Sequence, residues 1–297
     1  MVNKNLLLLG VDGGGTRCRA RLSTFSGQTL GDAVAGPANL RLGLDLSFAA
    51  VSDAALQCLD QADLPKTCLE QVVACLALAG ASEPGYLAAA QKRRHPFRKA
   101  LIITDAEAAC IGAHGEGDGG VIIAGTGTVG WARVNSKTHR VGGWGLPISD
   151  EGSGAWLGIE VLRRVVWASD GRIQWTPLLR AVFADFADDP HAIVKWTAMA
   201  TPRDFGSLAP RIADYAARRD AIGVELMQMA AAHVDHIAAR LVSLGAVKLA
   251  LVGGLASSLR SWLSAKTASQ LVEPFGDALD GALQLARSAA VAPARVA

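Results

Sequence analysis

The chain has 297 residues, of which 51% are hydrophobic, so it is long enough to bury one large core or two medium ones. Its 29 basic and 27 acidic residues give a formal net charge of +2, which argues against a nucleic-acid partner held mainly by charge. No apolar stretch approaches the ~20 residues of a membrane span, and the run at residues 6–9 is too short for a signal peptide.

The five cysteines are scattered through apolar segments and include no Cys-x-x-Cys pair, which suits a protein that stays reduced. We therefore expect a soluble cytoplasmic protein with neither a membrane nor a nucleic-acid partner.

The first predicted elements are two strands joined by a glycine turn. Residues 6–11 and 17–24 have the pattern of strands, with three glycines at 13–15 between them. Glycines let backbone amides approach a ligand closely. Asp12 is placed to hold a metal ion through water, and Thr16 adds a hydroxyl. This combination suits a nucleoside triphosphate with Mg²⁺, although an ordinary hairpin with an exposed acid has the same pattern.

Helices and strands alternate from the first turn to about residue 115. Helical periodicity spans residues 44–62, and Pro84 opens a second helix to about residue 94. The apolar runs 72–79 and 101–103 predict buried strands, and 106–114 predicts a helix. With a glycine-punctuated edge strand after residue 24, the order β-β-β-α-β-α-β-α indicates a mixed sheet flanked by helices.

A polar, glycine-rich break at residues 115–120 precedes a restart of the strand–turn–strand pattern. Strands are predicted at 121–124 and 129–135, with Gly125-Thr126-Gly127-Thr128 between them. The elements expected afterwards are helices at 155–168, 177–186, 190–200, 210–218 and 221–244, a strand at 247–252, a helix at 257–263, a strand at 271–273 and a last helix at 277–290.

Residues 124–130 also match the dinucleotide pattern Gly-x-Gly-x-x-Gly, and Glu151 lies near the distance of a ribose-binding acid. That motif needs a helix directly after the glycines. Residues 131–135 alternate like a strand instead. We therefore interpret the segment as a second phosphate turn, in which Thr126 supplies a hydroxyl.

Asp105 follows the predicted strand 101–103 and lies close to the first turn of a helix. A carboxylate there is either an ordinary helix N-cap or, in a phosphotransfer site, the base that accepts a hydroxyl proton. The position alone leaves both roles open.

Residues 142–154 combine glycines, Trp144 and two adjacent acids, Asp150 and Glu151, ahead of a helix. The density of glycines and acids favours a small polar ligand such as a sugar, although Asp150 could also cap the helix. Gly253 and Gly254 end a strand, where small residues would let a flat adenine lie against the backbone.

Together these motifs resemble the superfamily of sugar kinases, actin and heat-shock chaperones. Within it, residues 12–16 and 150–153 resemble the group of N-acetylglucosamine kinases and BadF/BadG ATPases. The likeness continues through residues 38–39, 78–81, 104–105, 201–204 and 277–283, and these later segments are most similar to bacterial glucosamine kinases.

The resemblance implies an α/β chain with a two-lobed, ribonuclease H-like (actin-like ATPase) fold and a nucleotide and sugar cleft between the lobes. The N-terminal lobe would span residues 1–115, and the C-terminal lobe 116–276. A final helix at about 277–297 would cross back to the first lobe.

The resemblance also implies an ATP-dependent kinase that converts glucosamine to glucosamine 6-phosphate, with Asp105 as the base. Mg²⁺ would be oriented by Asp12, through water. ATP would be bound by Gly13, Gly14, Gly15, Thr16, Gly125, Thr126, Gly127, Gly253 and Gly254. The positions that match sugar contacts are Asn39, Asp105, Thr128, Gly143, Gly145 and Asp150, whereas Glu151 would serve the geometry of the loop. We expect a homodimer.

N-acetylglucosamine is the alternative substrate, because the sequence does not show whether a carboxylate or an apolar niche lies beside C2 of the sugar. A more distant alternative is an ATPase activator of a radical dehydratase, which carries cysteines for an iron–sulfur cluster. Cys68 and Cys75 lie around the buried strand 72–79, which favours packing. A sugar-responsive regulator would need a helix-turn-helix segment ahead of Asp12, for which we see no room.

His233 and His236 lie three residues apart on a predicted helix and could form a metal pair. Without a third ligand nearby in the sequence, we expect them on an ordinary helix face.

Overall fold

The computed structural model describes residues 6–115 and 117–291. Contacts divide the chain into two compact units: unit 1 combines Met1–Gly117 with Glu273–Ala297, and unit 2 is Asp118–Val272. These limits differ by a few residues from the predicted boundaries at 115/116 and 276/277. None of the helices in the described part of the chain is both long enough and apolar enough to cross a membrane.

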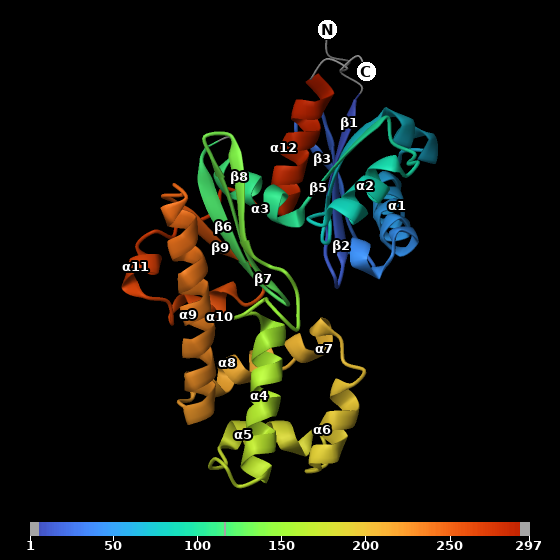
Figure 1. Cartoon of the computed structure of the whole chain (residues 1–297). Coiled ribbons are helices and arrows are strands. Elements are labelled where there is room, and N and C mark those ends of the chain that lie inside the picture. The colour runs from blue at the N-terminus through green and yellow to red at the C-terminus, as the bar shows by residue number, and fades with distance from the viewer. Residues whose placement is uncertain (1–5, 116, 292–297) are drawn as a thin grey trace. The chain divides into compact units, whose positions relative to one another are not determined.

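A five-stranded mixed sheet forms the centre of unit 1 (Figure 1). Its spatial order is β3-β2-β1-β4-β5, in which β1, β4 and β5 run parallel and β2 and β3 are antiparallel. The strands are β1 (Leu7–Gly13), β2 (Cys18–Thr24), β3 (Thr29–Ala35), β4 (Val72–Leu78) and β5 (Lys99–Ile103). Strand β4 is buried at every position, as expected of a parallel strand covered on both faces.

Helices cover both faces of this sheet. They are η1 (Leu40–Leu42), α1 (Leu44–Gln61), η2 (Lys66–Gln71), α2 (Pro84–Lys92), α3 (Asp105–His114) and α12 (Ala278–Val291). Helix α1 packs on β2 and β3, and α12 packs on β1, β4 and α3, as Figure 1 shows for the red helix. The predicted order of elements in the first 115 residues is confirmed, with boundaries shifted by one to a few residues.

Two glycines allow α3 and α12 to approach closely. A Cβ on Gly112 would collide with the backbone carbonyl of Asp277, and one on Gly281 would collide with that of Ala108. The start of α12 is therefore held against the helix that begins at Asp105.

Unit 2 contains a four-stranded sheet with the order β8-β7-β6-β9. The strands are β6 (Gly119–Ala124), β7 (Thr128–Val134), β8 (Lys137–Gly142) and β9 (Leu249–Val252). The predicted strands around the second turn are confirmed, whereas β8 was missed. Every residue of β8 is partly or fully exposed, so this edge strand has neither an apolar run nor an alternating pattern.

Helices make up most of the rest of unit 2. They are α4 (Gly154–Ser169), α5 (Pro177–Ala184), α6 (Pro190–Thr197), α7 (Pro202–Gly206), α8 (Ala209–Ala217), α9 (Ala221–Ser243), α10 (Ala256–Arg260) and α11 (Ala265–Ala268). All the predicted helices are confirmed, but the short α7 and α11 were not predicted. The strand predicted at 271–273 is wrong: Leu271 makes only an isolated bridge with Leu249. Pro274 follows closely and has no N–H to extend the pairing.

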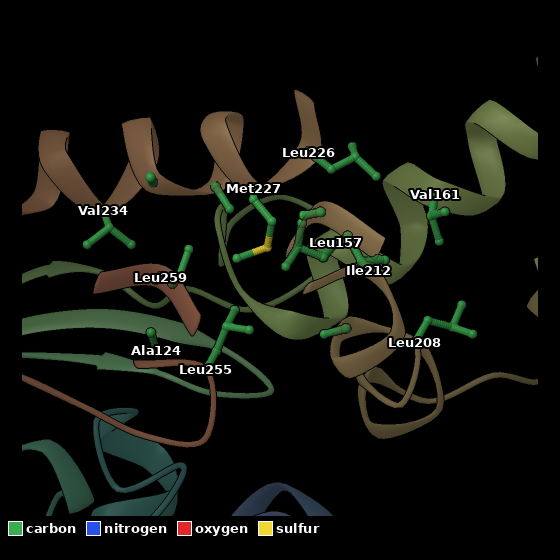
Figure 2. Close-up of a cluster of buried hydrophobic side chains, with 14 of the residues drawn as sticks. Ala124, Leu157, Val161, Leu208, Ile212, Leu226, Met227, Val234, Leu255 and Leu259 are labelled. Carbon is green, nitrogen blue, oxygen red and sulfur yellow. The ribbon is translucent and has the colours of Figure 1, made fainter. Parts of the chain in front are cut away.

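A dense apolar core lies behind the second glycine turn. Figure 2 shows side chains of α4, α8 and α9 meeting Ala124 at the end of β6 and Leu255 and Leu259 beyond β9. Leu157 of α4 and Met227 of α9 are fully buried. Burying one such side chain stabilises the fold by about 1.5–3 kcal/mol, so the strand ends that carry the predicted site rest on rigid support.

Candidate active site

Three parallel strands of unit 1 end side by side, and predicted site residues lie at the ends of β1 and β5. Asp12, Ala77 and Ile103 lie in register across β1, β4 and β5. Because neighbouring strands are about 4.8 Å apart, the Cα atoms of Asp12 and Ile103 lie roughly 10 Å from each other. Asp105 comes two residues after Ile103. Unit 1 therefore brings Asp12 and Asp105 to the carboxyl edge of its sheet, the edge at which α/β proteins bind ligands.

The first glycine turn is closed by its own backbone. The N–H of Gly14 donates to the carbonyl of Arg17 at 2.9 Å. A Cβ on Gly13 would lie 2.6 Å from Cδ2 of Leu78, so the start of the turn has room for glycine only. Gly15 and Thr16 are exposed, and within the described residues their N–H groups donate to no backbone carbonyl. Such amides can bind phosphate oxygens.

Asn39 is fixed beside this turn. The N–H of Ala38 donates to the carbonyl of Gly14 at 3.0 Å, and the side-chain Oδ1 of Asn39 accepts from the N–H of Arg41 at 3.0 Å. A Cβ on Gly80 would come within 2.9 Å of that Oδ1. Asn39 thus lies between the glycine turn and the segment after β4, next to a cavity of about 540 Å³ lined by Leu40, Arg41, Gly43, Leu44, Glu83, Gly85, Tyr86 and Ala89.

Thr104, not Asp105, is the N-cap of α3. Its hydroxyl accepts from the N–H of Glu107 at 3.0 Å, whereas Asp105 is the first helical residue. The Oδ1 atom of Asp105 accepts from the N–H of Ala106 at 2.9 Å. The capping interpretation of Asp105 is therefore wrong, and a negative charge in the first turn is stabilised by the helix dipole.

Arg19 forms an ion pair with Asp12 across the first hairpin, and the sequence did not predict this contact. The two residues face each other in the β1–β2 register, and Nη2 and Nε of Arg19 lie 2.7 Å and 3.1 Å from Oδ2 of Asp12. The turn consists of residues 14–17, whereas a turn of the three glycines alone would set Asp12 opposite Thr16, so the sequence did not indicate this pair. Burial lowers the pKa of Arg19, but hydrogen bonding to Asp12 and the charges of Asp12 and Asp277 outweigh it and raise that pKa.

The other oxygen of Asp12 suits a hard cation. Within the described residues, Oδ1 of Asp12 has no hydrogen-bond partner, and the side chain is 22% exposed. Carboxylate oxygens are the ligands that Mg²⁺ prefers, often through its water molecules. The donor set at the end of β1 therefore fits the predicted ion.

The second glycine turn belongs to unit 2 and is fixed to the start of α4. The carbonyl oxygens of Gly125 and Thr126 accept from the N–H groups of Gly154 and Ala155, at 2.8 Å and 3.2 Å. The cap of α4 is Ser153, whose fully buried hydroxyl accepts from Trp156 N–H at 3.1 Å. The turn is consequently held by the same helix start that closes the predicted sugar loop.

Gly253 and Gly254 lie beside this turn because β9 pairs with β6. The N–H of Leu255 donates to the carbonyl of Ala124 at 3.0 Å, and a Cβ on Gly253 would collide with that carbonyl. A Cβ on Gly254 would meet open space. Unit 2 thus brings the predicted adenosine contacts next to the predicted phosphate contacts.

Asp150 joins the predicted sugar loop, residues 142–154, to the second glycine turn. Its Oδ1 accepts from the N–H of Gly145 at 3.0 Å, and a Cβ on Gly127 would come within 2.5 Å of its Oδ2. The loop needs positive φ at Asp150, Gly143 and Gly145 (68°, 72° and 95°). Because Ser153 is the cap, the capping interpretation of Asp150 is wrong.

Arg140 supports the same loop and was not predicted. Its Nε donates to the carbonyl of Gly142 at 3.0 Å, a second nitrogen donates to that of Gly143, and its guanidinium lies 4.2 Å from the centroid of Trp144. A single arginine on a polar edge strand carries no signal in the sequence that would connect it to this loop.

Thr128 carries a buried hydroxyl without a partner among the described residues. It is 2% exposed, and within the described residues its hydroxyl has no hydrogen-bond partner. A buried hydroxyl left unpaired costs about 1–3 kcal/mol. Thr128 directly follows Gly127, which touches Asp150, so a sugar hydroxyl at this place would satisfy it.

Glu151 has different surroundings from its neighbour Asp150. It lines a cavity of about 240 Å³ together with Val141, Gly142, His233, His236 and Ile237. His233 packs edge-on against Trp156 at 5.1 Å, and His236 is exposed on α9. Among the residues that the structure describes, no three His, Cys, Asp or Glu side chains gather to hold a metal ion.

Comparison with known proteins identifies the family. A model of the BadF/BadG/BcrA/BcrD ATPase family matches residues 9–284. The chain is 38% identical over 278 residues to the glucosamine kinase GspK of Vibrio cholerae. The matched region covers 94% of this chain and 95% of the relative.

Solved structures agree with this grouping. A crystal structure of a proposed N-acetylglucosamine kinase from Chromobacterium violaceum matches 95% of this chain and 99% of its own, with 35% identity and a TM-score of 0.90. A ROK-family glucokinase from Streptomyces griseus, 19% identical with a TM-score of 0.58 over 95% of this chain and 99% of its own, shares the fold. The predicted fold class, an α/β chain of the two-lobed actin-like ATPase type, is confirmed. Because the family model spans most of its length, this chain belongs to the BadF/BadG/BcrA/BcrD ATPase family.

Proposed function

We propose that the protein is an ATP-dependent amino-sugar kinase that converts glucosamine and ATP to glucosamine 6-phosphate and ADP. The proposal includes Mg²⁺ as the metal, a cytoplasmic location and a homodimer. Its main support within the chain is Asp105, which lies at the carboxyl edge of the unit 1 sheet while Thr104 takes over the capping of α3. The similarity to the Vibrio glucosamine kinase supports the choice of substrate.

In this reaction Asp105 accepts the proton of the sugar 6-hydroxyl, and that oxygen attacks the γ-phosphorus of ATP. The bond from the γ-phosphorus to the bridging oxygen breaks, and ADP leaves. Phosphoryl transfer depends mainly on positioning and on neutralising charge. The exposed amides of the two glycine turns would bind phosphate oxygens, and Mg²⁺, held by Asp12 through water, would supply positive charge.

Each unit carries polar side chains that the proposal assigns to the sugar. In unit 2, Asp150 lies against Gly127, the residue before Thr128, and in unit 1 Asn39 lies beside the first turn. The unpaired, buried hydroxyl of Thr128 supports this assignment, because it needs a polar partner that the described part of the chain does not provide.

N-acetylglucosamine is the second candidate substrate. The observation that favours it is the 35% identity to the Chromobacterium protein, whose structure is described as a proposed N-acetylglucosamine kinase.

A coupled ADP-release assay with glucosamine, N-acetylglucosamine, mannosamine and glucose tests the proposal. We expect the highest kcat/KM with glucosamine, phosphorus NMR of the product showing a 6-phosphate, and no turnover of 6-deoxyglucosamine. The kinase assignment fails if no hexosamine is phosphorylated with Mg-ATP, and a preference for N-acetylglucosamine would replace only the substrate.

A further inference from the structure

Arg19 bridges two carboxylates that belong to different parts of unit 1. Its Nη2 and Nε bind Oδ2 of Asp12, and its Nη1 lies 2.8 Å from Oδ2 of Asp277. Asp277 is itself anchored, because its Oδ1 accepts from the N–H groups of Leu279 and Asp280 at the start of α12. One nitrogen of the guanidinium is thus bound by the Asp277 carboxylate at the start of α12, and its two other nitrogens bind Asp12.

This contact fixes the rotation of the Asp12 carboxylate. Both nitrogens that reach Asp12 bind the same oxygen, Oδ2, and within the described residues Oδ1 has no partner. A planar guanidinium with two hydrogen bonds to one carboxylate constrains that group more than a single point charge does. One oxygen is consequently committed to the protein, and the other is presented in a defined direction.

We propose that Arg19 is a positioning residue of the kinase reaction, which holds Asp12 so that Oδ1 meets the water shell of the metal ion. The inference rests on the proposed kinase function and assigns a role to a residue outside the predicted site. Partners in the outer shell of a metal site typically change activity or affinity by about 10- to 100-fold when they are replaced.

Arg21 provides a matched control on the same strand face. It lies two residues further along β2, so its side chain points to the same side of the sheet. Its Nε lies 2.7 Å from Oδ1 of Asp32, and its Nη1 lies 3.0 Å from Oδ1 of Asp280. Arg21 thus ties β2 to the start of α12 much as Arg19 does, with similar exposure, but it does not touch Asp12.

The test compares Arg19→Gln, Arg19→Lys and Arg21→Gln in the full chain. We expect Arg19→Gln to lower kcat about 10- to 100-fold, Arg19→Lys to lie between it and wild type, and Arg21→Gln to keep most of its turnover. A second readout is Mn²⁺ binding to the protein–ADP complex, followed by electron paramagnetic resonance. In Arg19→Lys, which keeps the positive charge but lacks the planar fork, this binding should be weaker than in wild type, because Oδ1 of Asp12 is no longer held toward the water shell of the ion.

A double-mutant cycle with Asp12→Asn completes the test. If Arg19 acts through Asp12, adding Arg19→Gln to Asp12→Asn should produce no further loss of kcat. Equal kcat values for Arg19→Gln and Arg21→Gln, unchanged Mn²⁺ binding in Arg19→Lys, or additive losses in the cycle would each overturn the inference. Wild-type turnover is measured first: its absence contradicts the proposed function, whereas active wild type with equal arginine variants contradicts only the role of Arg19.

Discussion

Replacing Asp105 by asparagine separates chemistry from folding at the start of α3. The structure assigns the cap to Thr104 and gives Asp105 a hydrogen bond from Ala106 N–H, which an asparagine oxygen can also accept. The loss of stability should then be limited to the helix-dipole contribution of one partly exposed charge, about 0.3–1 kcal/mol.

The effect on turnover should be much larger. Removing a general base usually costs at least about 10²-fold in rate. At 1.36 kcal/mol for each tenfold change, that is about 2.7 kcal/mol of transition-state stabilisation. Asp105→Asn should therefore lose at least this factor in kcat with glucosamine while ATP binding persists.

Thr104→Ala is the matched control because it should give the opposite pattern. Loss of the hydroxyl that accepts from Glu107 N–H removes a helix cap, which costs about 1 kcal/mol of stability. The carboxylate of Asp105 remains, so most of the turnover should be retained. Thermal unfolding, ATP titration calorimetry and steady-state kinetics measure the three quantities. An ATP-binding Asp105→Asn protein that keeps most of its turnover would remove Asp105 from the mechanism.

Three further predictions follow from burial, charge and close packing. Burial raises the pKa of Cys18 to about 12, whereas Cys68 is partly exposed. In the native protein at pH 8, a thiol reagent should therefore label Cys68 before Cys18, which mass spectrometry of the labelled protein measures. Burial alone would raise the pKa of Asp277, but the guanidinium of Arg19 and the backbone N–H groups lower this pKa overall. Ionised Asp277 therefore stabilises the fold at pH values above the usual aspartate pKa. That stabilisation is lost as the pH falls through the lowered pKa. In Asp277→Asn, the free energy of unfolding should fall less steeply with decreasing pH over this acidic range. An unchanged pH dependence would contradict the assignment. Gly112→Ala should cost about 1–3 kcal/mol by overpacking α3 against the start of α12. Gly85→Ala, where a Cβ meets nothing within 4 Å, should be neutral or slightly stabilising, and equal denaturation midpoints would refute the packing argument.

Local patterns were sufficient to predict most elements and the position of the two turns. A run of apolar residues followed by an acid and glycines predicts a strand end with an accessible backbone, and β1 with Asp12 has this form. The same logic located Asp105 at the end of β5. These predictions succeed because a parallel sheet places the carboxyl ends of its strands at one edge, whatever the loops contain.

Local patterns were insufficient where two neighbouring residues could serve the same role or where contacts were distant. Threonine and aspartate are both good caps, and only the extended backbone at Thr104 (φ −77°, ψ 149°) shows which of the two is used before α3. Ser153 rather than Asp150 caps α4 for the same reason. The bond from Arg19 to Asp277 joins residues 258 positions apart, and no local pattern encodes it.

Among the described residues, the two glycine turns leave backbone N–H groups unpaired in the same way. In a trans peptide the carbonyl and the following N–H point in opposite directions. The protein anchors the carbonyl of Gly14 with Ala38 N–H, and those of Gly125 and Thr126 with the first amides of α4. The N–H groups of Gly15, Thr126 and Gly127 must then point away from these anchors, and within the described residues none of them donates to a backbone carbonyl. Because each carbonyl is bound on one side of its peptide, the N–H group on the other side stays available, and both turns can therefore present amides to anionic oxygens.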